Sequence, residues 1–331
     1  MARRNLAPAQ LAVVQAVRAV RDACTDPVLV GVSGGADSMA LALASHHVLG
    51  ARVTCLVVDH GLQPGSGDVA AGVVSGLRAR GILARSVAVQ VGDAGRGPEA
   101  SARDARYAAL LAGSPGTLLL GHTLDDQAET VLLRLARGSG ARSLAGIPQR
   151  NGAIVRPLLG LGRSTTRQAC REWSADVWDD PHNADPRFTR SRVRTEVMPV
   201  LADVLGPGVV RSLARTADLA RQDADALDAL SASAYRRHRA TDDAAGLDAR
   251  WLAGLIPAIR TRVLRLWLDE QGVGAVGHDH TRAIEALVTA WHGQRGCSLP
   301  GGATVVRTSG RLFLSGVSSA EARVEPWMPQ T

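Results

Sequence analysis

The amino-acid sequence predicts an α/β fold: a Rossmann-like domain built on a parallel sheet, a long helical linker and a small second α+β domain. Three observations predict it. Apolar strand-like runs alternate with helical stretches along the first half of the chain, as they do in parallel sheets. A glycine-rich turn joins the first of these runs to a helix. One long helical pattern and a group of short strand-like pieces follow in the second half.

The elements of the first half follow one another in a regular order. A helical pattern over residues 6–24 comes first. Strands are predicted at 28–32, 52–58, 82–89 and 117–121, and helices at 37–49, 67–80, 98–113 and 124–137. The alternation predicts a parallel sheet with helices on both faces. Ligands of such sheets bind at the carboxyl ends of the strands, where the richest motifs of this chain are found.

The sequence changes character at Gly206-Pro207-Gly208. Residues 209–235 then carry a narrow apolar stripe, which is typical of a linker helix or a packing arm. The later elements are predicted helices at 249–271 and 279–292 and short strands at 297–299, 303–308 and 311–315. The predicted parts of the chain are therefore a first domain, a helical linker and a small C-terminal domain, over residues 1–207, 208–245 and 246–331.

The composition points to an anionic partner. Of the 331 residues, 46% are hydrophobic, which is enough for a sizeable core, and the formal net charge is +7. The 38 basic residues are all arginine, whose planar guanidinium group binds phosphate through two hydrogen bonds. A genome rich in arginine codons would give the same excess, and composition alone does not separate the two explanations.

The cysteines and the N-terminus indicate the cellular compartment in which we expect the protein. Cys24, Cys55, Cys170 and Cys297 lie far apart, and no pair has the spacing of a metal site or a redox motif. The N-terminus lacks the apolar core of a signal peptide, and no stretch of 18 apolar residues occurs. We therefore expect a reduced, cytoplasmic protein without a membrane partner.

The segment from Val30 to Ser38 carries the strongest functional signal: a buried strand, a tight glycine turn and the start of a helix. The free amides and the positive dipole end of a helix N-terminus form a phosphate site. The turn has neither the lysine of a Walker loop nor the glycine spacing of a dinucleotide site. An ordinary glycine-rich turn is the alternative. The predicted phosphate-binding residues are Ser33, Gly34, Gly35, Ala36, Asp37 and Ser38.

Two further motifs are weaker on their own. The second strand ends in Asp59 and His60, which form either a titratable pair beside the first loop or a capping aspartate with a surface histidine. Arg103 and Arg106 share one face of a predicted helix. Arg103 either points toward a nucleotide or nucleic acid, or forms a surface pair with Glu99.

The fourth predicted strand leads to His122, and an acidic helix start follows. Thr123 fits an N-cap with Asp126 at the capping-box position, so part of the acidity has a structural cause. Asp125 and Glu129 lie four residues apart on one helix face and repel each other unless a cation binds them. Mg²⁺ and the ammonium group of a small amine substrate are the two candidate cations.

Arginine clusters follow this motif. Arg137 and Arg142 flank a glycine loop, and Arg190, Arg192 and Arg194 alternate along one short stretch. A charge cluster is often only a solvated face. On a net-basic chain with a nucleotide motif, however, it indicates RNA, and these five arginines are the predicted RNA-binding residues.

Taken together, the motifs resemble those of the tRNA(Ile)-lysidine synthetases, a family of PP-loop enzymes in the N-type ATP pyrophosphatase superfamily. The resemblance spans about residues 27–200, in order and at compatible spacing. Gln63 stands where the family commonly has arginine, and Ser191 where it has asparagine. The matching segments are Ser33–Ser38, Val58–Leu62, Glu99–Tyr107, Gly121–Thr130, Arg156–Leu159, Asp180–Asn183 and Arg190–Arg194.

The resemblance implies an AMP-forming carbon–nitrogen ligase. ATP would adenylate the oxygen on carbon 2 of the wobble cytidine in a tRNA(Ile) with a CAU anticodon, and pyrophosphate would leave. The amine of free L-lysine would then displace AMP and form lysidine. Residues 1–207 would be the adenylating PP-loop domain, and residues 246–331 a tRNA-binding domain.

The resemblance also implies roles for the motif residues. Catalysis would involve Asp37, His60, His122, Asp125, Asp126 and Glu129. ATP and pyrophosphate would be held by Ser33, Gly34, Gly35, Ala36, Asp37, Ser38 and Arg103. Mg²⁺ would be bound by Asp37 and by Asp125 or Asp126, and the tRNA by Arg137, Arg142, Arg190, Arg192 and Arg194. The oligomeric state stays open, with a homodimer among the expectations.

Three other classes of protein share some of these features. A PP-loop thiolase acting on tRNA would use paired cysteines, which the scattered cysteines disfavour. A small-molecule amide-forming ligase would not require the arginine clusters. A non-catalytic nucleotide-sensing or RNA-binding module would not require the histidines and acids at the strand ends.

Overall fold

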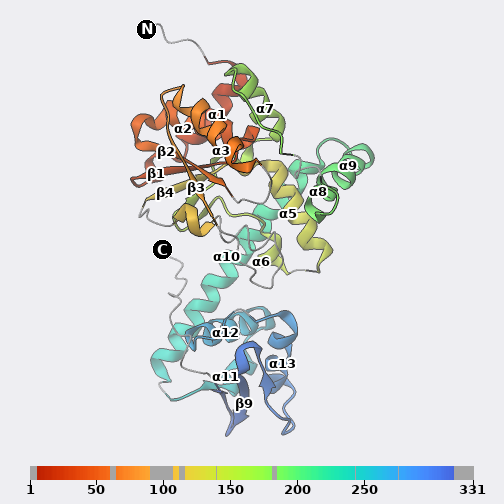
Figure 1. Ribbon diagram of the computed structural model, residues 1–331. Helices are drawn as coiled ribbons and strands as arrows, with labels where there is room; N and C mark the ends of the chain where they lie inside the picture. Colours follow the sequence, from red (N-terminus) through yellow and green to blue (C-terminus); the bar gives the residue numbers. More distant parts are fainter. Residues whose placement is uncertain are drawn as a thin grey trace. The chain divides into compact units, whose positions relative to one another are not determined.

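The computed structural model describes residues 6–59, 65–89, 107–111, 116–138, 140–180, 185–242, 244–274 and 276–316 (Figure 1). His60, Gln63 and Arg103 therefore lie outside the described residues. The chain divides into two compact units, Met1–Arg221 and Gln222–Thr331, and each has its own apolar core. The three-part division with boundaries at 207 and 245 stays a prediction.

The first unit is built on a six-stranded sheet in the order β3-β2-β1-β4-β6-β5. All neighbouring strands are parallel except β5 with β6. The strands are β1 (Val28–Val32), β2 (Val53–Asp59), β3 (Leu83–Ala88), β4 (Thr117–Leu120), β5 (Arg150–Asn151) and β6 (Ile154–Val155). The sheet confirms the α/β class and the four strands predicted from apolar runs.

Side chains of β1 alternate between the two faces of the sheet. Val28, Val30 and Val32 enter the larger core, whereas Leu29 belongs to a smaller core on the other face. A strand that is buried on both faces gives a continuous apolar run, which is why the sequence reveals it. The helices that contribute to the larger core are α1 (Pro8–Arg18), α2 (Ala36–Leu49), α3 (Ser66–Arg78) and α7 (Arg163–Glu172) (Figure 1).

The connectivity creates a crevice between β1 and β4. From β1 the chain passes to β2 and then β3, and β4 is placed on the other side of β1. Ligands of doubly wound sheets bind at such a switch point, beyond the carboxyl ends of the strands. α2 begins directly after β1, and α5 (Leu124–Ala136) begins directly after β4. The N-termini of both helices therefore face this crevice.

The sequence patterns do not predict several short elements of the first unit. α7 buries only Thr166, Ala169 and Cys170, so it lacks the large apolar residues that would indicate a helix. The helix predicted over 6–24 ends at Arg18. The other short elements are α6 (Ala141–Leu144), α8 (Thr189–Arg192), the π-helical turn η5 (Val193–Val197), α9 (Met198–Leu205) and the 3-10 turns η1 (Arg21–Ala23), η2 (Gly50–Arg52) and η3 (Pro157–Gly160).

The second unit is a small α+β domain, as predicted. The long helix α10 (Val209–Thr241) begins in the first unit and ends in the second. The other elements are α11 (Ala249–Gly254), α12 (Pro257–Glu270), α13 (His278–Thr289), the 3-10 turn η6 (Pro300–Gly302) and an antiparallel sheet in the order β7-β10-β9-β8. Its strands are β7 (Leu247–Asp248), β8 (Cys297–Ser298), β9 (Thr304–Thr308) and β10 (Arg311–Ser315).

The helix predicted over 249–271 is two helices in the structure. Ile256 is extended, and Pro257 begins α12. A proline disfavours the helical conformation of the residue before it. Proline also has no backbone N–H, and it fits the first position of a helix because the N–H there has no partner within the helix. The prediction of one continuous helix was therefore wrong at this point.

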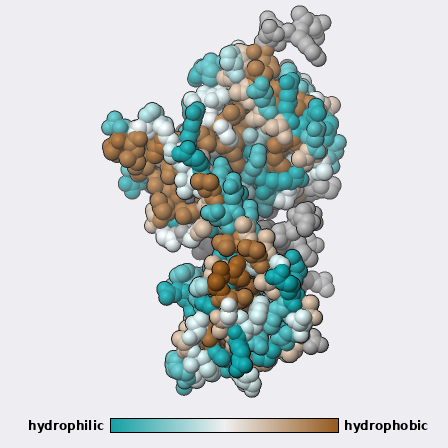
Figure 2. Space-filling model, turned by 180° about the vertical axis from the view of Figure 1, so that it is seen from behind, coloured by the Kyte–Doolittle hydropathy of each residue, from teal (hydrophilic) through white to brown (hydrophobic). Residues whose placement is uncertain are grey.

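The surface carries an apolar region on α9. Val200, Val204 and Leu205 are exposed there, and Figure 2 shows the helix as a brown projection. Among the described residues, no single helix is long and apolar enough to cross a membrane. Two neighbouring helical segments, Thr189–Leu205 and Val209–Thr241, are long and apolar enough only when taken together, and a bend of 99° separates them.

Candidate active site

The turn after β1 is closed by hydrogen bonds. Ser33 donates its backbone N–H to Oγ of Ser38 at 3.1 Å, and this Oγ donates to the Gly35 carbonyl at 2.9 Å. Gly34 has a φ of +85°, which L side chains rarely adopt. A Cβ added at Gly34 would also lie 2.8 Å from Cγ2 of Val73. Both the backbone conformation and the neighbouring helix α3 therefore require glycine here.

α2 begins at Ala36, with Gly35 extended at the N-cap. The first amides of a helix have no partner within the helix and carry the positive end of its dipole. Because the N-cap residue is glycine, it has no side chain to accept a hydrogen bond from them. The geometry of residues 33–38 fits the phosphate site expected from the sequence.

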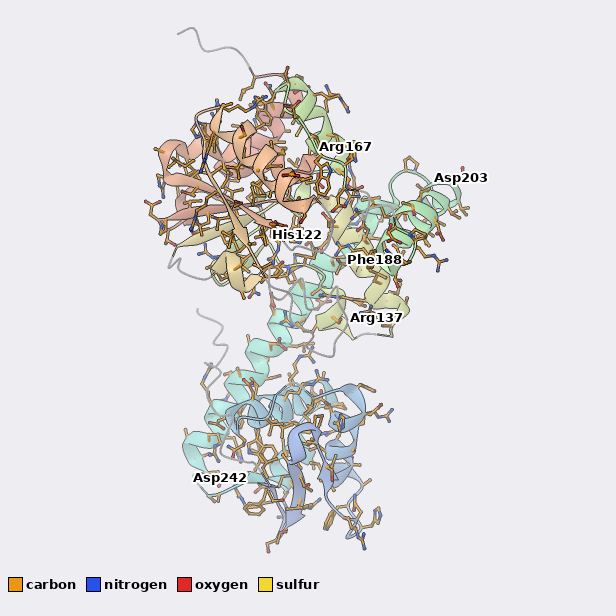
Figure 3. All side chains as sticks on the ribbon, in the orientation of Figure 1. His122, Arg137, Arg167, Phe188, Asp203 and Asp242 are labelled. Atoms are coloured by element: carbon orange, nitrogen blue, oxygen red, sulfur yellow. The ribbon has the colours of Figure 1, made fainter. Side chains whose placement is uncertain are left out.

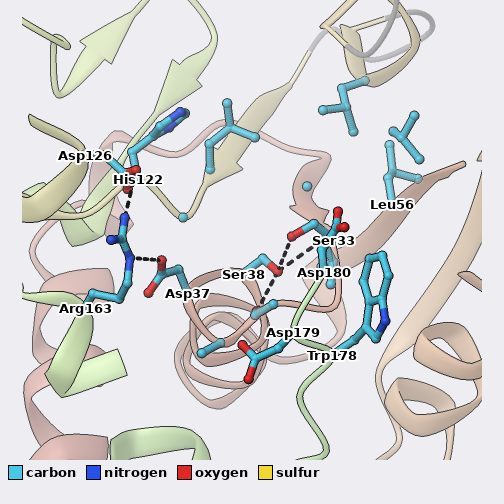
Figure 4. A pocket seen from close by; sticks show the side chains of 18 of the residues that line it. Ser33, Asp37, Ser38, Leu56, His122, Asp126, Arg163, Trp178, Asp179 and Asp180 are labelled. Carbon is cyan, nitrogen blue, oxygen red and sulfur yellow. Dashed lines mark hydrogen bonds and ion pairs between the residues drawn. The ribbon is translucent and has the colours of Figure 1, made fainter. Parts of the chain in front are cut away.

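Gly121 brings the end of β4 against the first turn of α2. A Cβ added at Gly121 would lie 3.0 Å from both the backbone carbon and oxygen of Asp37, which is closer than ordinary contact. Glycine therefore allows the close approach. As a result His122 and Asp126 of α5 line the same pocket as the glycine turn (Figure 4).

The pocket that these residues share has a volume of about 500 Å³ (Figure 4). Leu56, Leu110 and Leu120 make one part of its lining apolar, whereas Asp37 and His122 belong to its polar part. A concave site with an apolar lining and a few polar groups is the usual form of a small-ligand pocket. The pocket therefore joins the glycine turn to the acidic start of α5.

The acids of α5 have different partners. Thr123 and Asp126 form the predicted capping box, since the N–H and Oγ1 of Thr123 both donate to Oδ2 of Asp126 at 2.8 Å. Asp125 accepts the backbone N–H of Arg163 at 2.7 Å and so holds the start of α7. Glu129, one turn further, has a side chain that is only 2% exposed.

Three arginines surround the carboxylates of Glu129 and Asp126. Nε of Arg194 and Nε of Arg190 donate to Glu129 at 2.7 and 2.9 Å. Nη1 of Arg163 donates to the same carboxylate at 3.3 Å. The three guanidinium groups also lie 3.1 to 3.4 Å from Oδ1 of Asp126. The cations beside these acids are therefore arginines of the chain itself, and Mg²⁺ or an ammonium group at this place stays a prediction.

The arginines predicted to bind RNA fall into two groups. Arg190 and Arg194 are 27% exposed and turn toward the acids of α5. Arg192 is exposed and pairs with Glu196. Arg137 and Arg142 are exposed at the far end of α5 and on α6, and Figure 3 shows Arg137 well away from His122. Contact with RNA stays a prediction for all five.

The cluster sets the charge of its acids. Burial works to raise the pKa of Asp126, but the charges of Arg163 and Arg190 outweigh it and hold this pKa below its ordinary value. Burial also works to raise the pKa of Glu129, and the hydrogen bond and charge of Arg194 bring it below the ordinary value. Both groups are therefore carboxylates at neutral pH.

Asp37 is in a different electrostatic environment. It accepts a hydrogen bond from Oγ1 of Thr166 and pairs with Nε of Arg163 at 3.4 Å. Burial outweighs these contacts and raises the pKa of Asp37. The folded protein therefore disfavours the charged form of Asp37 more than water does.

Several pocket residues are missing from the motifs, among them Arg163 and Trp178. Arg163 is the first residue of α7, where a basic side chain opposes the helix dipole. Because this position is unfavourable for a cation, it indicates that the guanidinium group has another role, here its ion pairs with Asp37, Asp126 and Glu129. Trp178 donates its backbone N–H to the Gly34 carbonyl at 3.0 Å and lines the pocket. No pattern in the sequence identifies it, because its acidic neighbours resemble a solvated loop.

Comparison with known proteins assigns a family to both parts of the chain. Residues 10–201 match the model of a PP-loop domain, and residues 247–313 match the TilS substrate binding domain. A tRNA(Ile)-lysidine synthase of Salinispora tropica is 51% identical over 324 residues, covering 93% of this chain and 96% of the relative. One of Streptomyces coelicolor is 51% identical over 300 residues, covering 87% and 84%.

The chain belongs to the tRNA(Ile)-lysidine synthase family. It is therefore a tRNA-modifying ligase with an ATP-binding PP-loop domain, as the sequence motifs predict. The arginine and acid residues of the site lie within the segment that matches the PP-loop model.

A solved structure shares part of this fold. A U34-tRNA thiolase from Methanococcus maripaludis, solved with its [4Fe-4S] cluster, matches with a TM-score of 0.52 at 17% identity. The match covers 64% of this chain and 80% of the thiolase, and it shows a shared fold. The present chain has free cysteines, at Cys24, Cys55, Cys170 and Cys297. Among its described residues, no group of three or more His, Cys, Asp and Glu side chains is arranged to hold a metal ion.

Proposed function

We propose that this chain joins L-lysine to carbon 2 of the wobble cytidine of a tRNA(Ile) with a CAU anticodon. The products are lysidine, pyrophosphate and AMP. The observation that carries the proposal is the pocket at which the glycine turn, His122 and Asp126 of α5 converge, with Asp125 and Glu129 just behind its lining. An adenylating ligase needs a phosphate site, a polar group for proton transfer and a site for a cationic amine within reach of one another.

The first half-reaction would adenylate the base. The oxygen on carbon 2 of cytidine attacks the α-phosphorus of ATP, a new oxygen–phosphorus bond forms, and the bond to the β-phosphate oxygen breaks. Negative charge then develops on the leaving pyrophosphate, where the turn of residues 33–38 offers amide and hydroxyl donors. The apolar part of the pocket, with Leu56 and Leu120, suits the adenine ring.

Mg²⁺ fits this site through Asp37. Magnesium in nucleotide enzymes usually takes one or two carboxylates together with phosphate oxygens, so a cage of three protein ligands is not needed. Burial raises the pKa of Asp37, so a cation beside it would stabilise its charged form. Bound there, Mg²⁺ would neutralise charge on the phosphate oxygens. Asp125 or Asp126 stays the proposed second ligand.

The second half-reaction would transfer lysine. The amine attacks carbon 2, the carbon–oxygen bond breaks, and AMP leaves with that oxygen. We assign the ammonium group of lysine to Asp125 and Glu129, with Asp126 beside them. Because Glu129 already has three arginine partners, the ammonium must compete with a guanidinium group for it. His122, with His60 as the alternative, accepts a proton that the amine loses.

The tRNA completes the proposed complex. Its wobble base must leave the anticodon stack to reach the pocket. We assign tRNA phosphates to the exposed Arg137, Arg142 and Arg192, and to Arg190 and Arg194 close to the pocket. ATP contact by Arg103, a cytoplasmic location and a homodimer are also part of the proposal, and sedimentation of the purified chain tests the dimer.

Mass spectrometry tests the function directly. A CAU-anticodon tRNA(Ile) transcript is incubated with the protein, ATP, Mg²⁺ and lysine. The wobble cytidine is expected to gain the mass of lysine less one water, and omission of lysine should prevent the gain. Asp37→Asn is expected to abolish the product, whereas Asp203→Asn, on exposed α9, should not. An unmodified wobble cytidine with the wild-type protein would overturn the proposal.

A further inference from the structure

Arg163 links the two halves of the pocket. Its backbone N–H is held by Asp125, and its guanidinium group contacts Asp37 on α2 as well as Asp126 and Glu129 on α5. Figure 4 shows the side chain between Asp37 and Asp126. It is 18% exposed and lines the pocket, so a ligand in the pocket can reach it.

No ion pair of Arg163 is shorter than 3.1 Å, whereas Arg190 and Arg194 each make one of 2.9 Å or less. The ion pairs of Arg163 measure 3.4 Å to Asp37, 3.1 Å to Asp126 and 3.3 Å to Glu129. Strong charge-assisted N–H···O bonds measure about 2.7–2.9 Å. Arg163 thus divides its donors among three carboxylates without a close bond to any of them.

The other two arginines hold the α5 acids more tightly. Arg194 and Arg190 approach Glu129 at 2.7 and 2.9 Å. If Arg163 turned away, Glu129 would keep both of these close partners, and Asp126 would keep the two donors of Thr123. The cluster can therefore release Arg163 more easily than either of the other two.

A phosphate at the start of α2 offers Arg163 a better partner. Asp37 lies in the first turn of α2, the same turn that supplies the amides of the anion site. A guanidinium group 3.4 Å from Asp37 is therefore beside that site. Phosphate presents oxygens in pairs, which the planar guanidinium group binds through two hydrogen bonds. Since Asp125 fixes the backbone of Arg163, only side-chain torsions need to change.

We propose that Arg163 contacts the phosphates of ATP: when the nucleotide enters, the guanidinium group leaves Asp126 and Glu129 and binds phosphate oxygens. The proposal rests on the proposed use of ATP at the turn of residues 33–38. No covalent bond changes in this step, because one set of hydrogen bonds replaces another. Arg163 is then a nucleotide-binding residue of the adenylation step, contributed by α7.

Calorimetry with a non-hydrolysable ATP analogue and Mg²⁺ tests this assignment. Arg163→Ala is expected to weaken analogue binding about 10- to 100-fold, the usual effect of losing charge-assisted hydrogen bonds. Arg163→Lys should recover part of the affinity, since lysine keeps the charge but not the planar pair of donors. Arg171→Ala is the matched control, because Arg171 lies further along α7, is exposed and contacts Gln168.

A kinetic measurement separates nucleotide contact from a purely structural role. The proposal predicts a higher KM for ATP in the Arg163 variants and, at saturating ATP, where Arg163 has already left Glu129, an unchanged KM for lysine. Wild-type analogue affinity in folded Arg163→Ala would overturn it. If Arg163→Ala does not fold, Arg163→Lys decides, and wild-type affinity in that variant overturns the proposal equally. Absence of lysidine formation by the wild-type protein would reject the proposed function but leave the binding comparison valid, so the two failures are distinguishable.

Discussion

Glu129 shows how much one residue organises in this site. Its side chain is 2% exposed and receives guanidinium groups from α7, α8 and η5. Removing charges from water is costly, and such a cluster is stable only when the charges balance and the hydrogen bonds are made. One carboxylate on α5 therefore helps to determine the positions of three neighbouring segments.

Glu129→Ala is expected to lower the free energy of unfolding by about 3–5 kcal/mol, because it removes the closest partner of Arg190 and Arg194 and leaves three partly buried guanidinium groups to share Asp126. Arg192→Ala is the control: it breaks the exposed pair with Glu196 and should leave stability nearly unchanged. Urea unfolding measures both variants. Similar destabilisation of the two would contradict a special role for the buried carboxylate.

Comparing Gly34→Ala with Gly65→Ala separates the effect of backbone strain from the effect of the shape of the glycine turn at residues 33–38. Gly34 and Gly65 both have positive φ, but a Cβ added at Gly65 meets nothing within 4 Å. Gly65→Ala should therefore cost about 1–2 kcal/mol of stability and leave affinity for an ATP analogue intact. Gly34→Ala adds a collision with Val73 and should abolish that affinity. Normal analogue binding by Gly34→Ala would mean that the turn is not the phosphate site.

At the scale of elements, the acids and arginines form a junction of α5, α7 and the α8–η5 segment. The contacts are few, but each is buried or partly buried, and they join helices that the sheet alone does not fix. Protonation of the acids should therefore loosen several elements together.

Acid is expected to weaken this junction. The arginines lower the pKa values of Asp126 and Glu129, so these acids bind protons more readily in the unfolded chain than in the folded protein. Their stabilisation is complete above the unfolded values of about 4 and is lost as the pH falls through the lower folded values.

Urea unfolding at a series of acidic pH values measures this effect, and Glu129→Gln should show a shallower decline in stability. The raised pKa of Asp37 acts in the opposite direction, because its protonation favours the folded state. Equal pH dependence of wild type and Glu129→Gln would show that Glu129 does not contribute.

The sequence reveals the elements and the acids of the site better than the contacts between them. β1, β2 and β4 are apolar on both faces, and the α5 acids carry a local motif with a capping box. The partners of Glu129 are remote: Arg163 is 34 positions away and Arg194 is 65. No local pattern pairs charges over such distances. α7 is not predicted, because its buried residues are too small to form the apolar pattern of a helix.

At the scale of the whole molecule, the net charge is unevenly distributed. Met1–Arg221 contains 26 arginines and 19 acidic residues, whereas Gln222–Thr331 contains 12 of each. The formal net charge of +7 therefore belongs to the first unit. The unit that matches a substrate binding domain has no net charge. We infer that long-range attraction of tRNA comes from the first unit and that the second contributes local contacts.

Salt dependence of tRNA binding tests this division. Arg137→Gln with Arg142→Gln should reduce the slope of log K against log salt by about 0.7–0.9 for each phosphate that the protein no longer neutralises. Arg236→Gln with Arg237→Gln, two exposed changes in the second unit, should alter the slope less. Filter binding over a range of salt concentrations measures both. A larger change from the second pair would contradict the inference.

Trp178 gives the protein an optical reporter of its own. Its backbone N–H donates a hydrogen bond to the Gly34 carbonyl, and the residue lines the pocket beside the glycine turn of residues 33–38. A nucleotide in the pocket would change the surroundings of the indole ring and with them its fluorescence. Titration with an ATP analogue is therefore expected to change the emission of the wild-type protein. Trp178→Phe should lose that change while the other tryptophans still emit, so occupancy of the site can be followed without a label.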